Sequence, residues 1–254
     1  MRKRYARNGP WVLDGIDLAV EPGRTTVIVA GNGIGKSTLL RLVAGASVPT
    51  EGRITGRPRT VGYVPERAPA AIRMTARQYL AHIGRMRGLS PGETSARTDE
   101  LAERLRLVPG PDVPIAALSK GNGQKVAVIQ AFLAPPELLV VDEPETGLDA
   151  PARAELAALM SEAEQDGARI LLSAHESAVP NGDLYRLRDG RLVPETVRGM
   201  RISLRPTRQG LRAAELAAEV LLEEPGRVVV RTEDADKLLL KALADGWSLI
   251  EAVA

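Results

Sequence analysis

The sequence predicts an α/β fold in which helices cover both faces of a parallel sheet, followed by a small α+β domain. Short apolar runs of strand length, such as Leu138–Val141 and Ile170–Ser173, alternate with segments of helical periodicity. A glycine-rich loop stands between an early apolar strand and a helix. The composition then shifts near Glu195–Gly199, which divides the chain into a predicted domain of residues 1–195 and a second of residues 196–254.

The N-terminal part is expected to begin with two strands and a helix. The turn Glu21-Pro22-Gly23 separates the predicted strands, which cover Trp11–Val20 and Thr25–Ala30. A helix over about Lys36–Ala44 follows the glycine-rich loop, and short extended pieces are expected around Arg53 and at Val61–Val64.

Residues from about 67 to 133 are predicted to form a helical subdomain. The first helix follows Thr75, a residue type favoured at helix N-termini, and repeats apolar residues at helical spacing. Ser90-Pro91-Gly92-Glu93 has the form of a capping box with proline at the first helical position. A third helix is expected to start near Ser119. The apolar stripes of these helices indicate core packing and carry no functional weight.

The remaining sequence is expected to continue the parallel sheet and then form the second domain. A helix over about Ala152–Gln165 lies between the two buried strands, and residues 183–194 indicate a hairpin that turns at Asp189-Gly190. The second domain is predicted in the order β-α-β-α-β, with elements at Arg201–Leu204, Gln209–Leu222, Arg227–Arg231, Asp234–Leu243 and Ser248–Val253.

The composition is that of an ordinary globular protein and excludes several kinds of site. Of the 254 residues, 44% are hydrophobic and 26% charged, and the net charge of +2 predicts no strong attraction to polyanions. Aromatic residues make up 3%, which leaves few rings for stacking on bases, so no nucleic-acid partner is expected. The absence of cysteine excludes disulfides and thiolate metal sites.

The sequence also lacks the signals of a membrane-spanning or exported chain. No apolar run approaches the roughly 20 residues of a membrane span. The basic N-terminus Met1–Arg4 is not followed by the apolar stretch of a signal peptide. We therefore expect a cytoplasmic protein, and we expect any membrane-spanning part to be another chain.

The glycine-rich loop has the sequence of a Walker A phosphate loop, and it stands in the required place between a strand and a helix. Its glycines let successive N–H groups turn toward phosphate oxygens, and the following helix N-terminus adds a positive dipole end. Lys36 would supply a charge to the β- and γ-phosphates of ATP, and Ser37 would ligate Mg²⁺. The predicted ATP-binding residues of the loop are Asn32, Gly33, Ile34, Gly35, Lys36, Ser37 and Thr38.

A dinucleotide-binding glycine fingerprint is the rival interpretation of Gly31-x-Gly33-x-Gly35. The Lys-Ser-Thr that follows the glycines argues against it, as does the missing final glycine.

Two acids end the apolar strand Leu138–Val141. Acids often follow strands because loops are polar, but ligands of open α/β sheets bind at this end of the strands. Asp142 is expected to hold Mg²⁺ through water, and Glu143 to polarise the attacking water. This interpretation is favoured because it shares one mechanism with Lys36 and Ser37.

Beyond these motifs, the chain resembles the ABC transporter nucleotide-binding domain over about residues 5–194. Leu118-Ser119-Lys120-Gly121-Asn122 is similar to the ABC signature, and Pro144–Asp149 is similar to the D-loop. The resemblance implies that Ser119 and Gly121 bind the γ-phosphate of ATP held by the opposite protomer, and that Asp149 reaches across the dimer. Leu171–His175 resembles the switch region, which would make His175 a catalytic residue beside Glu143 and Lys36.

The resemblance also covers the adenine site, and the chain departs from the family pattern at one predicted site residue. Tyr5 precedes Val12-Leu13-Asp14 at the spacing where the family places an aromatic that stacks on adenine, whereas Trp11 is expected to pack in the first β-layer. In the Q-loop, Glu66 stands where the family has glutamine. An ionised glutamate can accept or ligate but cannot donate. We predict that Glu66 still contacts the metal or the attacking water.

The resemblance implies a P-loop NTPase of ABC type, with a parallel-sheet core, an antiparallel β-subdomain and a helical subdomain. Such domains act as head-to-tail dimers, so the expected partners are a second copy or a paired ATPase subunit, and a multi-helix membrane permease. Met74–Leu80, Arg87-Gly88-Leu89 and the C-terminal segment look like ATPase subunits of bacterial multidrug and polyketide-type exporters. The chain is thus expected to be peripheral to the membrane, at its cytoplasmic face.

Two other functions are compatible with the sequence. The chain could be a soluble ABC ATPase that serves an assembly process, because neither a coiled-coil insertion nor a second ATPase domain is present to indicate the other non-transport groups. It could also be a nucleotide-dependent switch with slow turnover, which Glu66 suggests and Glu143 argues against.

Overall fold

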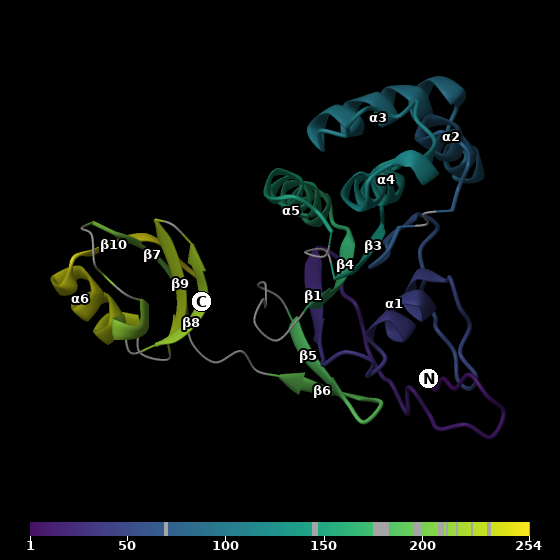
Figure 1. Ribbon diagram of the computed structural model, residues 1–254. Helices are drawn as coiled ribbons and strands as arrows, with labels where there is room; N and C mark the ends of the chain where they lie inside the picture. The colour runs from purple at the N-terminus through teal and green to yellow at the C-terminus, as the bar shows by residue number, and fades with distance from the viewer. Residues whose placement is uncertain are drawn as a thin grey trace. The chain divides into compact units, whose positions relative to one another are not determined.

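The computed structural model describes residues 1–68, 71–143, 147–174, 183–195, 200–207, 211, 213–216, 218–224, 226–232 and 235–253. The chain divides into two compact units, the first ending at Pro194 and the second running from Glu195 to Ala254 (Figure 1). Each unit has its own apolar core.

A six-stranded sheet forms the centre of the first unit, in the order β2-β3-β4-β1-β5-β6. The pairs β2–β3, β3–β4, β4–β1 and β1–β5 are all parallel. The central strands β3 and β4 are buried along nearly their whole length and consist mainly of apolar residues, as expected for parallel strands covered on both faces. The strands are β1 (Arg24–Val29), β2 (Val61–Val64), β3 (Leu138–Asp142), β4 (Arg169–Ala174), β5 (Asp183–Arg188) and β6 (Arg191–Glu195).

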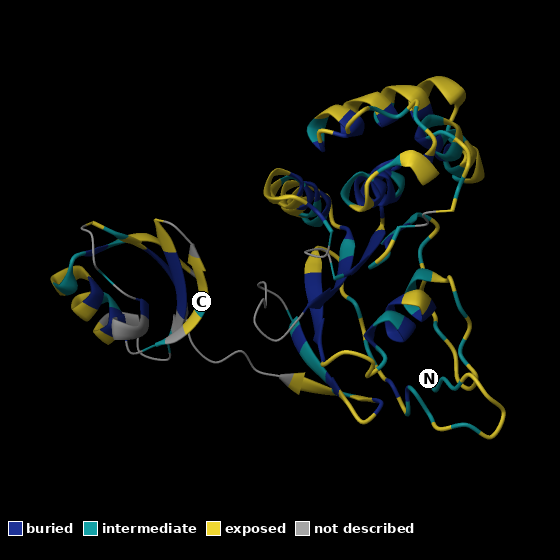
Figure 2. Ribbon diagram, in the orientation of Figure 1, coloured by how far each residue is buried: buried dark blue, intermediate teal, exposed yellow. Residues whose placement is uncertain are grey.

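Helices cover both faces of this sheet, as the buried strands between them show in Figure 2. Helix α1 (Lys36–Ala44) packs in one apolar cluster with Val140 and Leu171. The neighbouring residues Val141 and Leu172 point the other way and join a second cluster with helices α4 (Lys120–Phe132) and α5 (Ala150–Gln165). The period of two along each strand therefore assigns the helices to opposite faces.

The helical subdomain starts its helices where the capping chemistry predicts. Thr75 and Ser90 form capping boxes at the starts of α2 (Ala76–Met86) and α3 (Pro91–Arg104). Ser119 caps α4, which follows the short 3₁₀ turn η1 (Ile115–Ala117). In each case the side-chain oxygen accepts an N–H that the helix itself leaves unpaired.

The strand expected over Trp11–Val20 is not formed. Gly15 has a left-handed φ of 76°, which breaks an extended chain at this point. Backbone hydrogen bonds go instead to separate partners, such as Ile16 N to Met1 O at 2.9 Å. Antiparallel pairing in this region consists of the isolated bridges Arg2–Glu51 and Lys3–Leu13, and no strand forms around Arg53.

The second unit is a four-stranded antiparallel sheet in the order β10-β7-β9-β8. Its apolar core contains Ile202, Leu204, Val230 and Trp247 together with Leu238 of the helix. Its elements are β7 (Met200–Pro206), the 3₁₀ turn η2 (Ala213–Leu216), β8 (Glu219–Glu224), β9 (Arg227–Thr232), α6 (Ala235–Asp245) and β10 (Trp247–Val253).

The helix predicted over Gln209–Leu222 is wrong: the 3₁₀ turn η2 covers residues 213–216, and β8 begins at Glu219 and occupies the last four residues of that segment. The turn at Gly226, with a φ of 83°, folds β8 back onto β9, and backbone pairing between the two strands fixes the extended form. Tertiary pairing here overrides a local helical preference.

Across all the described helices, none has the length and apolarity needed to cross a membrane.

Candidate functional site

Several of the predicted site residues in the first unit lie at the carboxyl ends of its parallel strands. Val64 at the end of β2 lies opposite Val141, and Asp142 at the end of β3 lies opposite Ser173 of β4. Strand β1 ends beside β4 and leads into the glycine-rich loop. Ligands of open α/β sheets bind at this edge, and the strand order therefore brings the loop, Glu66 and both acids together.

The backbone of the glycine-rich loop strongly favours glycine at two positions. Gly33 and Gly35 have φ values of 76° and 115°. A Cβ added at Gly35 would also lie 3.1 Å from Val12 Cγ1 and 3.3 Å from the Val12 carbonyl oxygen. Because Gly35 is the N-cap of α1, no capping side chain occupies this helix end, and its N–H groups can receive an anion.

Lys36 joins the loop to the acid that follows β3. Its side chain is buried, and Nζ donates to the carbonyl oxygens of Ala30 at 2.6 Å and Gly31 at 3.4 Å. The same nitrogen forms an ion pair with Glu143 Oε1 at 3.1 Å. A cation is therefore held directly over the loop that would bind phosphates.

Asp142 is fully buried and has one oxygen engaged. Oδ1 accepts a hydrogen bond from Ser173 Oγ at 2.8 Å, whereas Oδ2 is buried with no hydrogen-bond partner in the described part of the chain. Burial raises the pKa of Asp142 above its usual range, and the negative charges of Glu143 and Glu66 add to the rise. The hydroxyls of Ser173 and Ser37 act in the opposite direction and lower this pKa.

These features fit a hydrated Mg²⁺. The unpartnered Asp142 Oδ2 can accept from a metal-bound water, and Ser37 stands close enough to lower the pKa of that carboxyl. No cluster of three or more His, Asp or Glu residues suited to a metal occurs among the residues that the structure describes. Mg²⁺ keeps several waters and commonly takes one or two protein ligands plus phosphates, so this sparse donor set suits it.

Glu143 adopts an unusual backbone conformation for a residue with a side chain. Its φ is 50°, in the sparsely populated left-handed region. Its N–H donates to Ser173 Oγ at 2.9 Å, and its carboxylate is turned toward Lys36.

Glu66 lies just beyond β2, in a loop that α4 holds. Burial raises the pKa of Tyr63 above its usual range, and the negative charges of Asp142 and Glu66 add to the rise, as the charge of Glu66 also does for Asp142. The buried amide of Gln124 donates to Pro65 O at 2.7 Å and accepts from Ala68 N at 3.1 Å. One side chain of the signature helix thus bonds the backbone on both sides of Glu66.

Ser119, Gly121 and Asp149, the predicted signature and D-loop residues that the structure describes, belong to the region of α4 and α5, whereas residues 144–146 of the predicted D-loop lie outside the described residues. Ser119 Oγ accepts from the Asn122 N–H at 3.2 Å, and a Cβ at Gly121 would lie 3.0 Å from the Gly147 carbonyl oxygen. Asp149 caps α5 and pairs with Lys125 Nζ at 2.8 Å, and this lysine holds the pKa of Asp149 below its usual range.

No hydrogen bond or ion pair links Ser119 or Asp149 to the phosphate loop within the described ranges of one chain. In the described part of a single copy, the hydrogen bonds and ion pairs of Ser119 and Asp149 are thus made within the α4 and α5 region.

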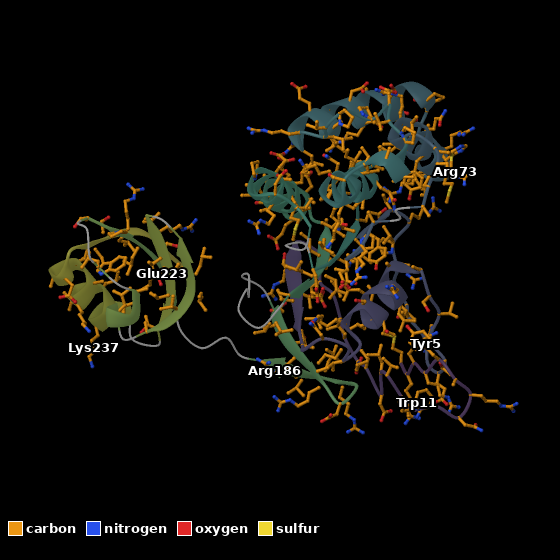
Figure 3. The ribbon with its side chains drawn as sticks, viewed as in Figure 1. Tyr5, Trp11, Arg73, Arg186, Glu223 and Lys237 are labelled. Atoms are coloured by element: carbon orange, nitrogen blue, oxygen red, sulfur yellow. The ribbon has the colours of Figure 1, made fainter. Side chains whose placement is uncertain are left out.

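Of the two candidate aromatic residues, Tyr5 is the one that meets the phosphate-loop helix. Its hydroxyl lies 3.0 Å from Thr38 Oγ1, and its ring is exposed, with Lys3 Nζ 5.3 Å from the ring centroid. The guanidinium groups of Arg2 and Arg4 lie 4.6 and 4.5 Å from the Trp11 ring centroid. Figure 3 labels both rings in the N-terminal part of the first unit. His175, the predicted switch residue, lies outside the described residues.

Sequence reasoning did not single out Ser173 or Gln124. The available signal was weak: Ser173 is a polar residue inside an apolar strand, and Gln124 is a polar residue in a largely buried helix. Their partners lie 31 and 59 residues away in sequence.

Comparisons with known proteins agree with this geometry. The family model described as ABC transporter matches residues 13–146. The zinc import ATP-binding protein ZnuC of Pseudomonas aeruginosa is 35% identical over 176 residues, which are 66% of this chain and 62% of that protein. The ABC transporter ATP-binding protein NatA of Bacillus subtilis is 30% identical over 63% of this chain and 70% of its own length.

A solved structure of an ATP-binding subunit of an ABC transporter superposes with a TM-score of 0.67 at 32% identity, covering 75% of this chain and 85% of the other. The chain belongs to the ABC transporter family, and its first unit is an ATPase domain of that family.

Proposed function

We propose that this chain is the ATP-binding and ATP-hydrolysing subunit of a transporter, and that it powers a separate membrane permease. The observation that carries the proposal is the meeting of Lys36, Asp142 and Glu143 beside the glycine-rich loop, at the carboxyl ends of β1 and β3. The chain spans less than two thirds of the length of ZnuC, so the activity of the whole protein is part of this proposal.

Each residue of the site has a role in the proposed reaction. The loop N–H groups and Lys36 hold the phosphates of ATP, and the lysine moves its charge from Glu143 to the γ-phosphate when nucleotide binds. Glu143, released from that pair, orients and polarises the attacking water. Ser37 and Asp142 hold Mg²⁺, which when bound neutralises charge on the phosphates. Glu66 contacts the metal or the water, and Tyr5 stacks on adenine.

A second copy, or a paired ATPase subunit, completes each site. The chain has one phosphate-loop sequence and one signature sequence, and the hydrogen bonds of Ser119 and Lys36 do not join the two motifs within the described residues of one copy. In the proposed head-to-tail dimer, Ser119 and the backbone of Gly121 bind the γ-phosphate held by the partner, and Asp149 reaches across the interface. His175 is proposed to contact the γ-phosphate in its own chain. A multi-helix permease places the dimer at the cytoplasmic face of the membrane.

We further propose a direction of transport, which depends on different residues from those of the ATP site. Export is predicted from Met74–Leu80, Arg87-Gly88-Leu89 and the C-terminal segment. The relatives whose names give a direction are zinc import proteins, and they do not support export. Transport in inside-out vesicles that carry the permease decides between the two directions: an exporter fills such vesicles upon ATP addition, and an importer empties them.

Hydrolysis is tested with Glu143→Gln, which keeps the size of the side chain and removes the carboxylate. We expect ATP to bind and turnover to fall by roughly 10²- to 10⁴-fold, the range for loss of a general base. Glu137→Gln is the matched control, because Glu137 stands at the opposite end of β3. Unchanged turnover in Glu143→Gln would remove the assigned role of this acid.

Transport is tested by trapping Glu143→Gln with ATP and incubating the tagged protein with detergent-solubilised membranes of its source cell. Mass spectrometry of the bound proteins then identifies the partner. Recovery of a multi-helix membrane protein supports the permease assignment. Recovery of soluble partners alone, with the trapped dimer intact, favours the assembly ATPase that the sequence left open.

A further inference from the structure

We propose that Ser173 is a positioning residue for hydrolysis, and that its single hydroxyl sets the placement of both acids. This inference rests on the proposed function. Ser173 is fully buried in β4, directly opposite Asp142 of β3. Its Oγ donates to Asp142 Oδ1 at 2.8 Å and accepts from the Glu143 N–H at 2.9 Å.

The direction of both hydrogen bonds is fixed by chemistry. A backbone N–H can only donate, so the hydroxyl must accept from Glu143. The hydroxyl proton is then available for Asp142, and an ionised carboxylate can only accept. A serine or threonine satisfies both neighbours at once, whereas alanine and valine satisfy neither of them.

The first bond determines which oxygen of Asp142 faces the metal. Oδ1 is occupied by Ser173, and Oδ2 is the buried oxygen without a hydrogen-bond partner among the described residues. Without the hydroxyl, the carboxylate could rotate and present either oxygen. Residues that orient metal ligands in this way commonly change metal affinity or activity by about 10- to 100-fold when they are replaced.

The second bond stabilises the conformation that aims the catalytic acid. Glu143 has a φ of 50°, which a residue with a Cβ adopts rarely unless the surrounding structure holds it there. The bond from its N–H to Ser173 anchors the residue to the neighbouring strand in this conformation. Its carboxylate then lies at the ion-pair distance of 3.1 Å from Lys36.

The test compares Ser173→Thr with Ser173→Val, because these two side chains have nearly the same shape and differ in the hydroxyl. Threonine adds one methyl group at this buried position, and valine adds the same group and replaces the hydroxyl with a second methyl group, so the added volume is closely matched and the hydroxyl is the main difference. Ser173→Ala removes the hydroxyl without adding volume and serves if the larger variants fail to fold. Urea unfolding of each variant reports its stability separately.

Two readouts are measured: turnover with saturating ATP, and Mn²⁺ binding to the complex with a non-hydrolysable ATP analogue by electron paramagnetic resonance. We expect Ser173→Thr to stay within about threefold of wild type in both. Ser173→Val and Ser173→Ala should lower kcat by about 10- to 100-fold and weaken Mn²⁺ binding by a similar factor. Affinity for the metal-free nucleotide should stay unchanged, because the phosphate loop keeps its contacts.

Equal kcat and equal Mn²⁺ affinity in Ser173→Thr and Ser173→Val would overturn the proposal, as would a folded Ser173→Ala that matches wild type. If the wild type hydrolyses no ATP, the proposed function fails. The Mn²⁺ readout then still decides whether Ser173 orients Asp142.

Discussion

Replacing Gln124 with methionine should release the loop that carries Glu66. Methionine keeps the length and volume of the side chain but cannot form the two hydrogen bonds. The amide now bonds Pro65 O at 2.7 Å and Ala68 N at 3.1 Å, one on each side of Glu66-Arg67. The helix that bears Gln124 begins at the signature serine, so this amide also links Glu66 to that helix.

The free-energy cost of Gln124→Met depends on how exposed the backbone groups of Pro65 and Ala68 are once they lose the amide. Pro65 and Ala68 are partly exposed, so water can replace part of what the amide provided. Each lost bond should therefore cost about 0.5–1.5 kcal/mol, the usual net value, and not the larger penalty of a fully buried group. The loop then opens more easily by about 1–3 kcal/mol in total, which corresponds to roughly 5- to 150-fold.

Limited digestion with trypsin measures this opening without reference to activity. The side chain of Arg67 is 83% exposed and lies between the two bonded backbone groups. Cleavage after Arg67 should accelerate by the same factor as loop opening, because proteolysis follows the population of the open form when opening is fast. Turnover of ATP, measured in parallel, should fall while KM for ATP changes little.

Gln130→Met is the matched control on the same helix, because the Gln130 amide oxygen accepts from the Tyr79 hydroxyl, whereas Gln124 bonds Pro65 and Ala68. It should unfold at lower urea concentration yet leave cleavage after Arg67 and turnover unchanged. The reasoning is refuted if Gln124→Met is cleaved at the wild-type rate. It is also refuted if Gln130→Met changes cleavage and turnover as much.

Three further predictions concern stability and the departure from the family pattern. Arg87 is partly buried and donates to the carbonyl oxygens of Gln130 at 2.7 Å and Val61 at 3.1 Å, so Arg87→Met should lower the free energy of unfolding by about 2–4 kcal/mol through the loss of these charge-assisted hydrogen bonds. Urea unfolding followed by Trp11 fluorescence, with Trp247 replaced by phenylalanine, checks this, and a loss below about 0.5 kcal/mol contradicts it. Arg104 joins α3 to Glu162 of α5 at 2.6 Å and holds the pKa of Glu162 below its ordinary value of 4.5. This ion pair stabilises the fold above pH 4.5, and its contribution is lost as the pH falls through the lowered pKa of Glu162. Arg104→Gln should therefore lower the free energy of unfolding by about 1 kcal/mol at pH 7. In thermal unfolding, the difference from wild type should shrink below pH 4.5. If the difference in stability between Arg104→Gln and wild type does not change with pH, the loss comes from side-chain packing and not from the ion pair. Glu66→Gln should keep turnover within about an order of magnitude of wild type, near 1.4 kcal/mol in barrier height, and a fall to background would make Glu66 a required acid.

Much of the site could be predicted from the sequence because its chemistry is local. The loop from Gly31 to Thr38 needs glycines, a lysine and a hydroxyl at fixed spacing, and it needs a strand before it and a helix after it. Helix starts at Thr75, Ser90 and Ser119 were predicted for the same reason, since a cap satisfies N–H groups two or three residues away. The continuous apolar runs that became β3 and β4 likewise indicated a buried parallel sheet.

The secondary-structure predictions that failed concern segments whose backbone conformation depends on hydrogen bonds to residues distant in the sequence. Trp11–Val20 has apolar residues suited to a strand, but Gly15 turns the chain and the N–H groups pair with separate segments. Part of Gln209–Leu222 became β8, because β9 offered a strand to pair with. Such preferences are weak compared with the hydrogen bonds that a neighbouring strand supplies.

By itself, the sequence predicted a glycine-rich loop between a strand and a helix, two acids at the end of a buried strand and the helix caps, because each depends on residues within one turn or one loop. The tertiary structure alone decided that Ser173 bonds Asp142 and that Gln124 bonds the loop around Glu66. The physical reason is strand register: the parallel pairing of β3 with β4 places Asp142 opposite Ser173, and a shift by one residue would turn that hydroxyl to the other face of the sheet. Register is set by the packing of the whole sheet, and a local motif does not contain it.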